Sequence, residues 1–267
     1  MSIVDKKYNF LKPLKTSNLV RLGRTHDGGY VVDATVINDC DILITFGLGP
    51  DWSFELDYIK RNKDVEIFIY DHTVSSKPYI KDVIKYLRRF LTFRATFESV
   101  SNRIKYLTNF KSFLNHKSVN YYKEKITFPI VDKIDTDVDK AFSRVKTTGD
   151  VVLKCDIDGG EYKVIDEILK YSSRIKMLIF EFHLVDNNEE NFYNSIKRIQ
   201  KNFDIIHIHG NNHFPKLDSG LPLILEITLI NKKFSPNNQE YVNNFPITGL
   251  DYPNNPFKED LVFSFGG

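Results

Sequence analysis

Cysteine, tryptophan and methionine are scarce in this chain of 267 residues, which has two, one and two of them, respectively. With only Cys40 and Cys155, a disulfide framework is excluded as the basis of the fold, and a reducing compartment is expected. No stretch approaches the roughly 18 apolar residues of a membrane helix, and the first residues lack the apolar core of a signal peptide. The sequence therefore predicts a cytoplasmic protein without a membrane span.

A large excess of one charge is also missing. Lys and Arg number 37 and Asp and Glu number 35, which gives a formal net charge of +2. Nucleic-acid-binding proteins usually show a basic excess on one face, so no nucleic-acid partner is expected. The densest basic cluster lies in an amphipathic segment, where it either forms a solvated helix face or contacts a substrate phosphate. It comprises Lys85, Arg88, Arg89 and Arg94.

Apolar strand-like runs alternate with helix-like periodicities along most of the chain. Strands are expected at 41–46, 65–70, 119–122, 151–155, 176–182, 204–209 and 223–230. Helices are expected at 52–61, 78–91, 102–114, 162–171 and 189–201. This alternation predicts a mostly parallel sheet covered by helices on both faces.

Only a loop joins the last two expected strands, so the final strand should run antiparallel to its neighbours. The predicted fold class is therefore α/β, a doubly wound, Rossmann-like, seven-stranded mixed sheet with the last strand antiparallel. This architecture resembles that of class I S-adenosylmethionine-dependent methyltransferases. We expect a single domain over residues 1–267, whose core is wrapped by the N-terminal segment 1–40 and by the Asn- and Pro-rich tail 233–267.

Two glycines end the first strand of the expected sheet, in the order Phe46-Gly47-Leu48-Gly49. Glycine at a strand tip lets a ligand approach the backbone closely. The dinucleotide fingerprint needs a further glycine where this chain has Trp52, so a donor without a pyrophosphate fits better. Asp71 closes the second strand, where a carboxylate accepts hydrogen bonds from a cofactor ribose; a turn or helix-capping role is the alternative.

Residues 46–49 and Asp71 form the expected cradle for the donor, and three further polar side chains are expected beside it. His72 follows Asp71 directly and could line the same pocket. Asp51 and Ser53 stand at the start of the first helix after the sheet begins. They either cap that helix or hold the amino and carboxylate groups of a methionine moiety.

The buried run 151–155 leads into the most charged segment of the chain, which contains Lys154, Asp156, Asp158 and Glu161. Ionisable side chains are costly to desolvate, so their clustering at the mouth of a parallel sheet indicates a polar pocket. The alternative is an ordinary charged loop between strand and helix.

Three blocks of the sequence resemble the FkbM-type methyltransferases: residues 21–30 (RLGRTHDGGY), residues 46–49 with Asp71, and residues 153–161 (LKCDIDGGE). The third block is similar to the family pattern L-K-I-D-x-E-G-x-E, with Asp158 where glutamate is usual. The resemblance spans about residues 20–230 and implies that S-adenosyl-L-methionine is the methyl donor. It also implies that Asp156 lies beside the donor sulfonium and that the turn Asp27-Gly28-Gly29-Tyr30 closes over the cofactor.

Methyl transfer to a hydroxyl requires alignment of the acceptor and removal of its proton. We expect His183 to be the general base, because imidazole titrates near working pH. Asp156, Asp158 and Lys154 complete the expected catalytic group. Lys154 could neutralise either carboxylate, or the carboxylates could hold Mg²⁺ or Mn²⁺ together with Glu181, so the presence of a metal stays open.

The acceptor side of the site is expected at the ends of the following two strands. Glu181 lies on the same strand face as His183, and it is expected to bind substrate. His209, Asn211 and Asn212 belong to an H-x-H-G-N-N turn whose amides and imidazole suit sugar hydroxyls, although a packing role is the alternative.

The sequence thus predicts an S-adenosylmethionine-dependent O-methyltransferase. The resemblance implies a sugar hydroxyl as acceptor, in a nucleotide-activated sugar or a surface (capsular) polysaccharide precursor. One alternative is a methyltransferase for a natural-product hydroxyl, a small-molecule amine or a phosphoryl-linked group. Another is a non-catalytic binding module on the same fold. The acceptor, the methylated position and the oligomeric state have no signature in the sequence.

Overall fold

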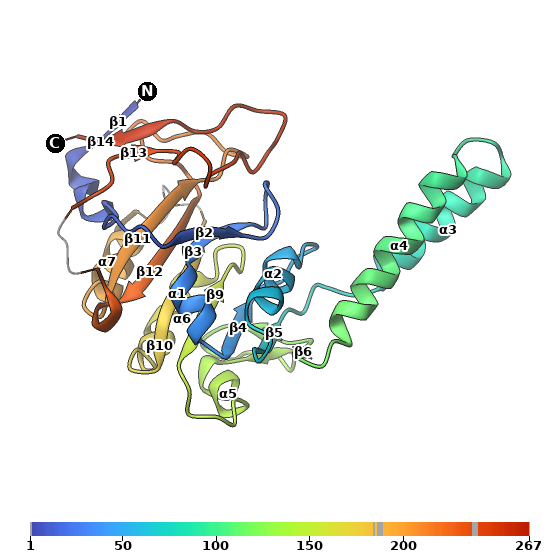
Figure 1. The fold of residues 1–267 in the computed structure, drawn as a ribbon, viewed down its shortest axis with the longest axis horizontal. Helices are drawn as coiled ribbons and strands as arrows, with labels where there is room; N and C mark the ends of the chain where they lie inside the picture. Colours follow the sequence, from blue (N-terminus) through green and yellow to red (C-terminus); the bar gives the residue numbers. More distant parts are fainter. Residues whose placement is uncertain (1, 184, 186–188, 237–239, 267) are drawn as a thin grey trace.

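The computed structural model describes residues 2–183, 185, 189–236 and 240–266. A seven-stranded sheet forms its centre (Figure 1). In spatial order the strands are β11 (Phe203–Gly210), β12 (Leu225–Asn231), β10 (Ile175–Phe182), β9 (Val151–Cys155), β4 (Ile42–Phe46), β5 (Glu66–Tyr70) and β6 (Val119–Tyr122). β12 runs antiparallel to β10 and β11, and all other pairs are parallel. The predicted fold class and the reversed strand are confirmed.

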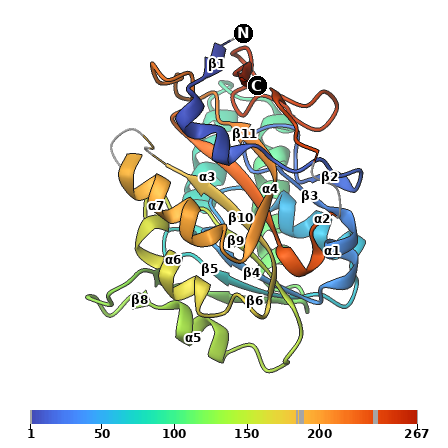
Figure 2. The same ribbon diagram turned by 90° about the vertical axis from the view of Figure 1, so that its left-hand side faces the viewer.

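Helices cover both faces of this sheet (Figure 2). One face packs against η1 (Lys6–Leu11), α5 (Val138–Ser143), α6 (Glu161–Leu169) and α7 (Glu189–Ile199). The other packs against α1 (Ala34–Asp39), α2 (Ser53–Arg61), the end of α4 (Phe97–Leu114) and the hairpin of β2 (Leu19–Leu22) and β3 (Tyr30–Asp33). Every residue of β4 and β9 is buried, because each of these strands is covered on both sides.

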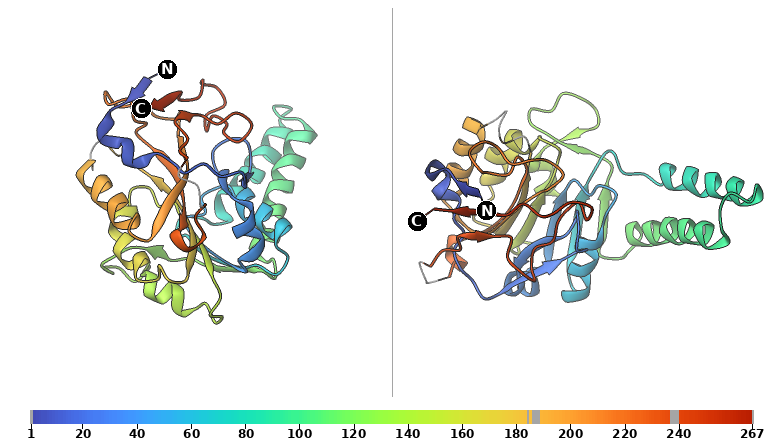
Figure 3. Two further views of the ribbon diagram at one scale, coloured as in Figure 1. Left: turned by 60° about the vertical axis from the view of Figure 1, so that its left-hand side comes forward. Right: turned by 90° about the horizontal axis from the view of Figure 1, so that it is seen from above.

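The two ends of the described chain meet in a second, three-stranded sheet (Figure 3). β1 (Ser2–Val4) pairs in parallel with β14 (Phe263–Phe265), which pairs antiparallel with β13 (Asn244–Phe245). The rings of Phe245 and Phe263 stack with centroids 5.3 Å apart. The described parts of the N-terminal segment and of the tail are therefore paired with each other in this sheet. The remaining short elements are β7 (Lys125–Ile126), β8 (Asp135–Thr136) and η2 (Lys232–Phe234).

α3 (Lys77–Leu91) and α4 form a helical hairpin that projects from the body of the protein (Figure 1). Both helices were expected, but α4 begins at Phe97 rather than at residue 102, because Thr96 caps it by accepting a hydrogen bond from the Ser99 amide. No residue of α3 is buried. The basic cluster that could contact a substrate phosphate lies on this hairpin and not at the ends of the central strands.

Among the helices that the structure describes, none has both the length and the apolar character of a bilayer-spanning segment.

Candidate functional site

The parallel register brings four loops to one edge of the sheet. Phe46 lies opposite both Tyr70 and Cys155, and Cys155 lies opposite Phe180. The segments that follow these residues therefore start side by side at the carboxyl ends of β4, β5, β9 and β10. They carry most of the residues that the sequence predicts for the donor and the catalytic group.

Gly47 and Gly49, which follow β4, are needed as glycines for different structural reasons. Both are in the left-handed region, with φ of +80° at Gly47 and +65° at Gly49. A Cβ atom on Gly47 would lie 1.7 Å from the carbonyl oxygen of Asp156, so packing between strand ends requires this glycine. A Cβ atom on Gly49 would meet no atom within 4 Å. Gly49 therefore faces the open space that a ligand needs.

Asp71 holds the glycine loop in place. One carboxylate oxygen accepts hydrogen bonds from the amides of Leu48 and Gly49, at 2.9 and 3.0 Å. The other accepts them from the amide and hydroxyl of Thr73 and from the Val74 amide. Burial acts to raise the pKa of Asp71, but the hydrogen bonds outweigh burial and lower it. The carboxylate is thus ionised, and it is already engaged with the loop to which the donor was expected to bind.

The turn Asp27-Gly28-Gly29-Tyr30 packs against the start of α2. A Cβ atom on Gly28 would lie 3.1 Å from the Asp51 side chain. Asp51 itself accepts a hydrogen bond from the Ser53 amide at 2.9 Å and forms an ion pair with Arg24 at 3.2 Å. The N-cap residue of α2 is Trp52, which makes no side-chain capping bond, and Asp51 binds the Ser53 amide from one position outside the helix. Contact of Asp51 with a methionine moiety stays a prediction.

The Tyr30 hydroxyl lies between two carboxyl groups, that of the buried Glu181 and that of the partly exposed Asp156. The Tyr30 hydroxyl donates to Asp156 Oδ2 at 2.8 Å and lies 3.5 Å from Glu181 Oε2. Asn211 donates to the other oxygen of Glu181 at 2.8 Å. Burial first, and then the charges of Asp156 and Glu226, raise the pKa of Glu181 well above its usual range. Burial and the neighbouring negative charges therefore favour the neutral form of the Glu181 carboxyl.

Lys154 lies behind these carboxyls and pairs with a residue of α2. Its Nζ is 3.6 Å from Glu55 Oε1 and 5.0 Å from the centre of the Tyr30 ring, and both charged side chains are almost fully buried. Burial acts to lower the pKa of Lys154, but the carboxyls of Glu55, Asp156 and Glu181 outweigh it and raise the pKa. Lys154 therefore stays cationic and neutralises part of the acidic charge.

His183 and Glu161 form a dyad beside Asp156. His183 Nδ1 lies 3.1 Å from Glu161 Oε1, whereas Nε2 lies 4.0 Å from Asp156 and 3.8 Å from Asp158. Glu161 is fully buried and also accepts hydrogen bonds from the Ile157 and Gly159 amides. Burial acts to lower the pKa of His183, but Glu161, Asp156 and Asp158 outweigh it and raise the pKa.

Asp158 has an exposed side chain and a left-handed backbone with φ of +53°. It stands at the rim of the site, above the His183 ring nitrogen that points away from Glu161. A non-glycine residue in this conformation is strained and often occurs at a functional site.

Three residues could together hold a divalent ion: Asp156, Glu161 and His183. Their candidate ligand atoms all lie within 4.8 Å of one another. Two carboxylates and one imidazole suit Mn²⁺ better than Mg²⁺, which prefers oxygen alone. Glu161 Oε2 is buried without a hydrogen-bond partner among the described residues, which fits an additional ligand. The set differs from the expected one, since it includes neither Asp158 nor Glu181.

The predicted acceptor residues of β11 and its turn contact the C-terminal tail. His209 is 1 % exposed and lies 3.2 Å from both Glu226 and Asp260. Burial acts to lower the pKa of His209, but the two carboxylates raise it to about 10. Asn212 donates to backbone carbonyls of residues 255, 258 and 259 and accepts from the Asn255 amide. These side chains anchor the tail, and substrate contact by them stays a prediction.

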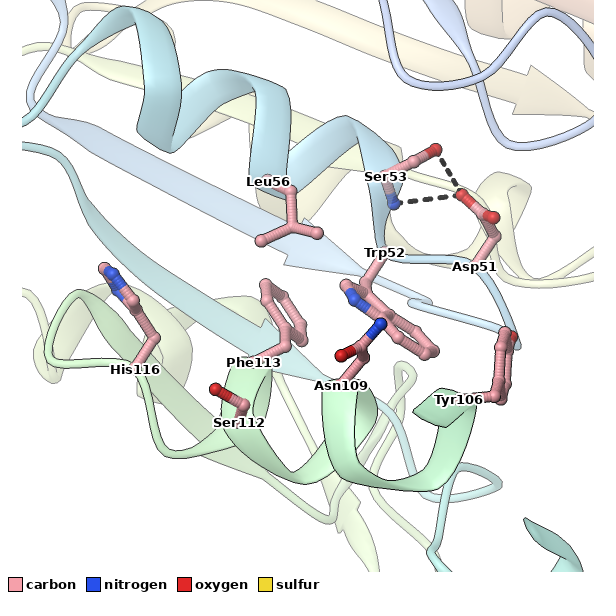
Figure 4. A pocket seen from close by; sticks show the side chains of 9 residues that line it. All are labelled: Asp51, Trp52, Ser53, Leu56, Tyr106, Asn109, Ser112, Phe113 and His116. Carbon is pink, nitrogen blue, oxygen red and sulfur yellow. Dashed lines mark hydrogen bonds between the residues drawn. The ribbon is translucent and has the colours of Figure 1, made fainter. Parts of the chain in front are cut away.

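A cavity of about 410 Å³ opens between α2 and α4 (Figure 4). It is lined by Asp51, Trp52, Ser53, Leu56, Tyr106, Asn109, Ser112, Phe113 and His116. A smaller one of about 170 Å³ lies at the base of the hairpin, beside Tyr79, Asp82, Arg103 and Tyr106. Among the described residues, Gly47, Gly49 and Asp71 line neither cavity.

Sequence reasoning missed the partners of two predicted catalytic residues. The charge of Glu161 is evident in the sequence, but its bond to His183 joins segments 22 residues apart. Glu55 lies in an ordinary amphipathic helix, and nothing in the chain indicates that its carboxylate contacts Lys154 of β9. The one available signal is a lone acid on the apolar side of that helix, since Glu55 is flanked by Phe54, Tyr58 and Ile59 in the buried set.

No protein-family model matches this sequence, and no curated protein matches it. Solved structures similar to the chain include the Methanococcus jannaschii fibrillarin pre-rRNA processing protein, at 9% identity, with 73% of this chain and 68% of that chain covered and a TM-score of 0.40. A precorrin-6y C5,15-methyltransferase from Geobacter metallireducens has 10% identity, 74% and 88% coverage and a TM-score of 0.37. A dimethyladenosine transferase from Plasmodium falciparum has 11% identity, 73% and 57% coverage and a TM-score of 0.37.

The central sheet itself identifies the fold. Of its seven strands, only β12 runs antiparallel to its neighbours, and it lies between β10 and the edge strand β11. By strand order and direction, this chain has the class I methyltransferase fold.

Proposed function

We propose that this protein is an S-adenosyl-L-methionine-dependent methyltransferase that methylates a hydroxyl group. The observation that carries the proposal is the His183–Glu161 dyad, which stands beside Asp156 at the carboxyl edge of the sheet. Ligands of open α/β sheets bind at that edge. A binding module would not require an oriented imidazole there.

We assign the donor to the cradle formed by residues 46–49, Asp71 and the turn 27–30. The open space at Gly49 supports this fit, because no atom of the described residues outside its chain neighbours lies within 4 Å of a Cβ built there. Asp71 orders the loop amides. We also assign to the donor His72, which follows Asp71 in the chain, and Asp51 and Ser53, which are bonded to each other at the start of α2. When bound, S-adenosyl-L-methionine supplies an electrophilic methyl group on a sulfonium.

We assign the base role to His183. Glu161 fixes the imidazole through Nδ1 and leaves Nε2 directed towards Asp156 and Asp158. A proton taken from the acceptor hydroxyl by Nε2 would be stabilised by these two carboxylates. The positive charge of Lys154 partly neutralises the negative charge of the nearby carboxylates.

The proposed acceptor is a sugar hydroxyl of a nucleotide-activated sugar or capsular polysaccharide precursor. The resemblance to the FkbM-type family supports this class. We assign contacts with the acceptor to Glu181, which follows the last residue of β10 that pairs with β9, and to the exposed Asp158, which lies 3.8 Å from His183 Nε2. We keep Asn211 in the acceptor group through its bond to Glu181.

A divalent ion on Asp156, Glu161 and His183 is the competing mechanism for the same atoms. An ion there would occupy His183 and would activate the hydroxyl by binding it. The two mechanisms are separated by exhaustive chelation followed by assay: unchanged turnover supports the imidazole base, and turnover restored only by Mn²⁺ supports the metal.

Calorimetric titration with S-adenosyl-L-methionine tests the enzyme against the binding module. We expect saturable micromolar binding, reduced at least tenfold in Asp71→Ala and unchanged in the exposed control Asp64→Ala. A second experiment incubates methyl-labelled donor with a panel of nucleotide sugars and identifies the product by mass and NMR. Absence of donor binding by a folded protein would refute the proposal; transfer to an amine or another non-sugar acceptor would refute the acceptor class only.

A further inference from the structure

The α3–α4 hairpin carries charge that the rest of the protein does not share. Residues 77–114 contain nine Lys and Arg and two Asp and Glu, a net charge of +7. The whole chain has a net charge of +2, so the remainder carries −5. The nearly neutral composition therefore conceals a strongly basic projection on an acidic body.

The outer end of this hairpin is apolar. Phe93 is 98 % exposed, Leu91 76 % and Phe97 74 %. Phe93 has a left-handed φ of +56°, a strained conformation for a residue that is not glycine. Phe93 belongs to the turn between α3 and α4, and this turn is the part of the hairpin farthest from the central sheet (Figure 1). We call Leu91, Phe93 and Phe97 the hairpin tip.

Basic side chains surround the tip, and apolar ones continue along the helices behind it. Arg88, Arg89 and Arg94 are all exposed and lie within five residues of Phe93 in the sequence. The exposed apolar side chains behind the tip are Ile80, Ile84, Leu87, Phe90 and Ile104. α3 spans roughly 22 Å at 1.5 Å per residue, so the tip can reach a surface well clear of the body.

The hairpin is braced as a unit. Arg103 of α4 pairs with Asp82 of α3 at 3.2 Å and lies over the Tyr86 ring at 4.7 Å. Near the tip, the rings of Phe90 and Phe97 contact each other edge to face at 6.3 Å. These contacts keep the apolar tip extended without covering it.

We propose that the hairpin tip docks this protein onto an anionic lipid surface. Apolar side chains that enter the headgroup region, ringed by arginines that pair with lipid phosphates, are the composition of an interfacial membrane anchor. Two hairpins of separate copies would each bring a charge of +7, so repulsion opposes their self-association. A nucleic acid would match the charge but not the exposed Leu91, Phe93 and Phe97. The proposal is independent of methyl transfer.

Vesicle flotation tests the proposal with the full chain. We expect the protein to float with vesicles of phosphatidylcholine and phosphatidylglycerol in equal parts, and to remain behind with phosphatidylcholine alone. The tip variant Phe93→Ser/Phe97→Ser should reduce flotation at least tenfold, and so should the charge variant Arg88→Gln/Arg89→Gln/Arg94→Gln.

The matched controls make the same kinds of substitution at exposed residues outside the hairpin. Phe257→Ser removes an apolar side chain that is 94 % exposed outside the hairpin, and Lys63→Gln/Lys123→Gln/Lys133→Gln removes the same charge as the arginine variant. Both controls should float like the unaltered protein, and circular dichroism should show every variant to be folded. In Phe93→Trp, tryptophan emission should shift to the blue on addition of the anionic vesicles.

Three results would overturn the proposal. The first is no flotation with either kind of vesicle. The second is equal flotation of the tip variant and the unaltered protein. The third is sedimentation as a dimer that Phe93→Ser/Phe97→Ser dissociates, because the tip would then be covered by a second copy.

Discussion

Asp156 lies near a candidate base, an acid whose pKa is raised, and a buried cation. Its neighbours are His183 at 4.0 Å, Tyr30 at 2.8 Å and, through that hydroxyl, Glu181. Burial raises the pKa of Asp156, whereas Lys154, His183 and Tyr30 lower it in part. At the scale of single residues, the charge state of Asp156 is therefore set by the balance between burial and its three polar neighbours.

The dyad predicts a specific pH dependence. The base acts in its neutral form, and the pKa of His183 is raised, so kcat/KM should rise with pH through a value above the usual histidine range. Glu161→Gln removes the carboxylate that raises this pKa, so the rising limb should move to lower pH. His183→Asn should lower turnover by about 10²- to 10⁴-fold. His116→Asn, in the α2–α4 cavity, is the control, and full turnover in His183→Asn would contradict the base role.

The buried ion pair of Lys154 and Glu55 predicts that loss of the lysine destabilises the protein more than loss of the glutamate charge. Lys154→Met leaves the buried acids Glu55 and Asp156 uncompensated and should cost about 3–5 kcal/mol of unfolding free energy. Glu55→Gln retains a hydrogen-bonding group near Thr45 and should cost less, and the double variant should be more stable than Lys154→Met alone. Urea denaturation measures all three. A double variant less stable than Lys154→Met would show that the pair is not coupled in this way.

At the scale of elements, the two glycines of the loop after β4 have different roles, because Gly47 is needed for packing and Gly49 is proposed to be needed for donor binding. Gly47→Ala would place a methyl group against the Asp156 carbonyl and should destabilise the protein by more than about 3 kcal/mol. Gly49→Ala meets no atom and should cost only about 1–2 kcal/mol for its left-handed backbone. It should nevertheless abolish donor binding. Thermal unfolding and calorimetry distinguish the two, and normal donor affinity in Gly49→Ala would remove the loop from the proposed cradle.

The long elements could be predicted because each has a strong local pattern. All seven strands of the central sheet were expected, and their observed ends differ by no more than two residues, as for β12, expected at 223 and observed from Leu225. Short elements such as α1 and α5 were not expected, since six residues carry too little periodicity. The projection of α3 was not predictable either, because an amphipathic stripe ordinarily indicates burial.

The candidate site was predictable only as a collection of strand ends. Parallel strands bring their ends to one edge, and the register of β5, β4, β9 and β10 puts Asp71, Asp156 and Glu181 at that edge, although their roles stay predictions. The partners could not be read from the sequence, because they depend on side-chain direction across the sheet. His209 illustrates this: its turn suits a sugar chemically, yet the tail residue Asp260 contacts its ring.

At the scale of the whole molecule, the tail is fastened by buried charge. His209, with its pKa of about 10, lies between Glu226 and Asp260, and His207 lies 3.0 Å from Asp251. Asn254 donates to Glu226 at 2.6 Å and thereby joins the tail to β12. The tail residues Asp251, Asn254 and Asp260 are therefore coupled to β11 and β12, the strands on the candidate acceptor side.

This fastening predicts alkaline weakening of the fold. The pKa of His209 is raised from about 6.5 in the unfolded chain, so the stabilisation is complete below that pH and is lost as pH rises through about 10. His209→Asn should be less stable near neutral pH, and its deficit should shrink towards pH 10. Urea denaturation across this range measures the difference, with the exposed His213→Asn as control. A deficit that is constant with pH would show that His209 is not the titrating group.

The pairing of β1 with β14 also determines how the protein would respond to tension. The two strands are parallel, in the register Ser2 with Phe263 and Val4 with Phe265. A force applied through the two ends would pull the strands lengthwise past each other, so their hydrogen bonds would be loaded together and not broken one by one. The sheet at the termini would thus act as a mechanical clamp, and pulling from an internal attachment point should open the protein at a lower force.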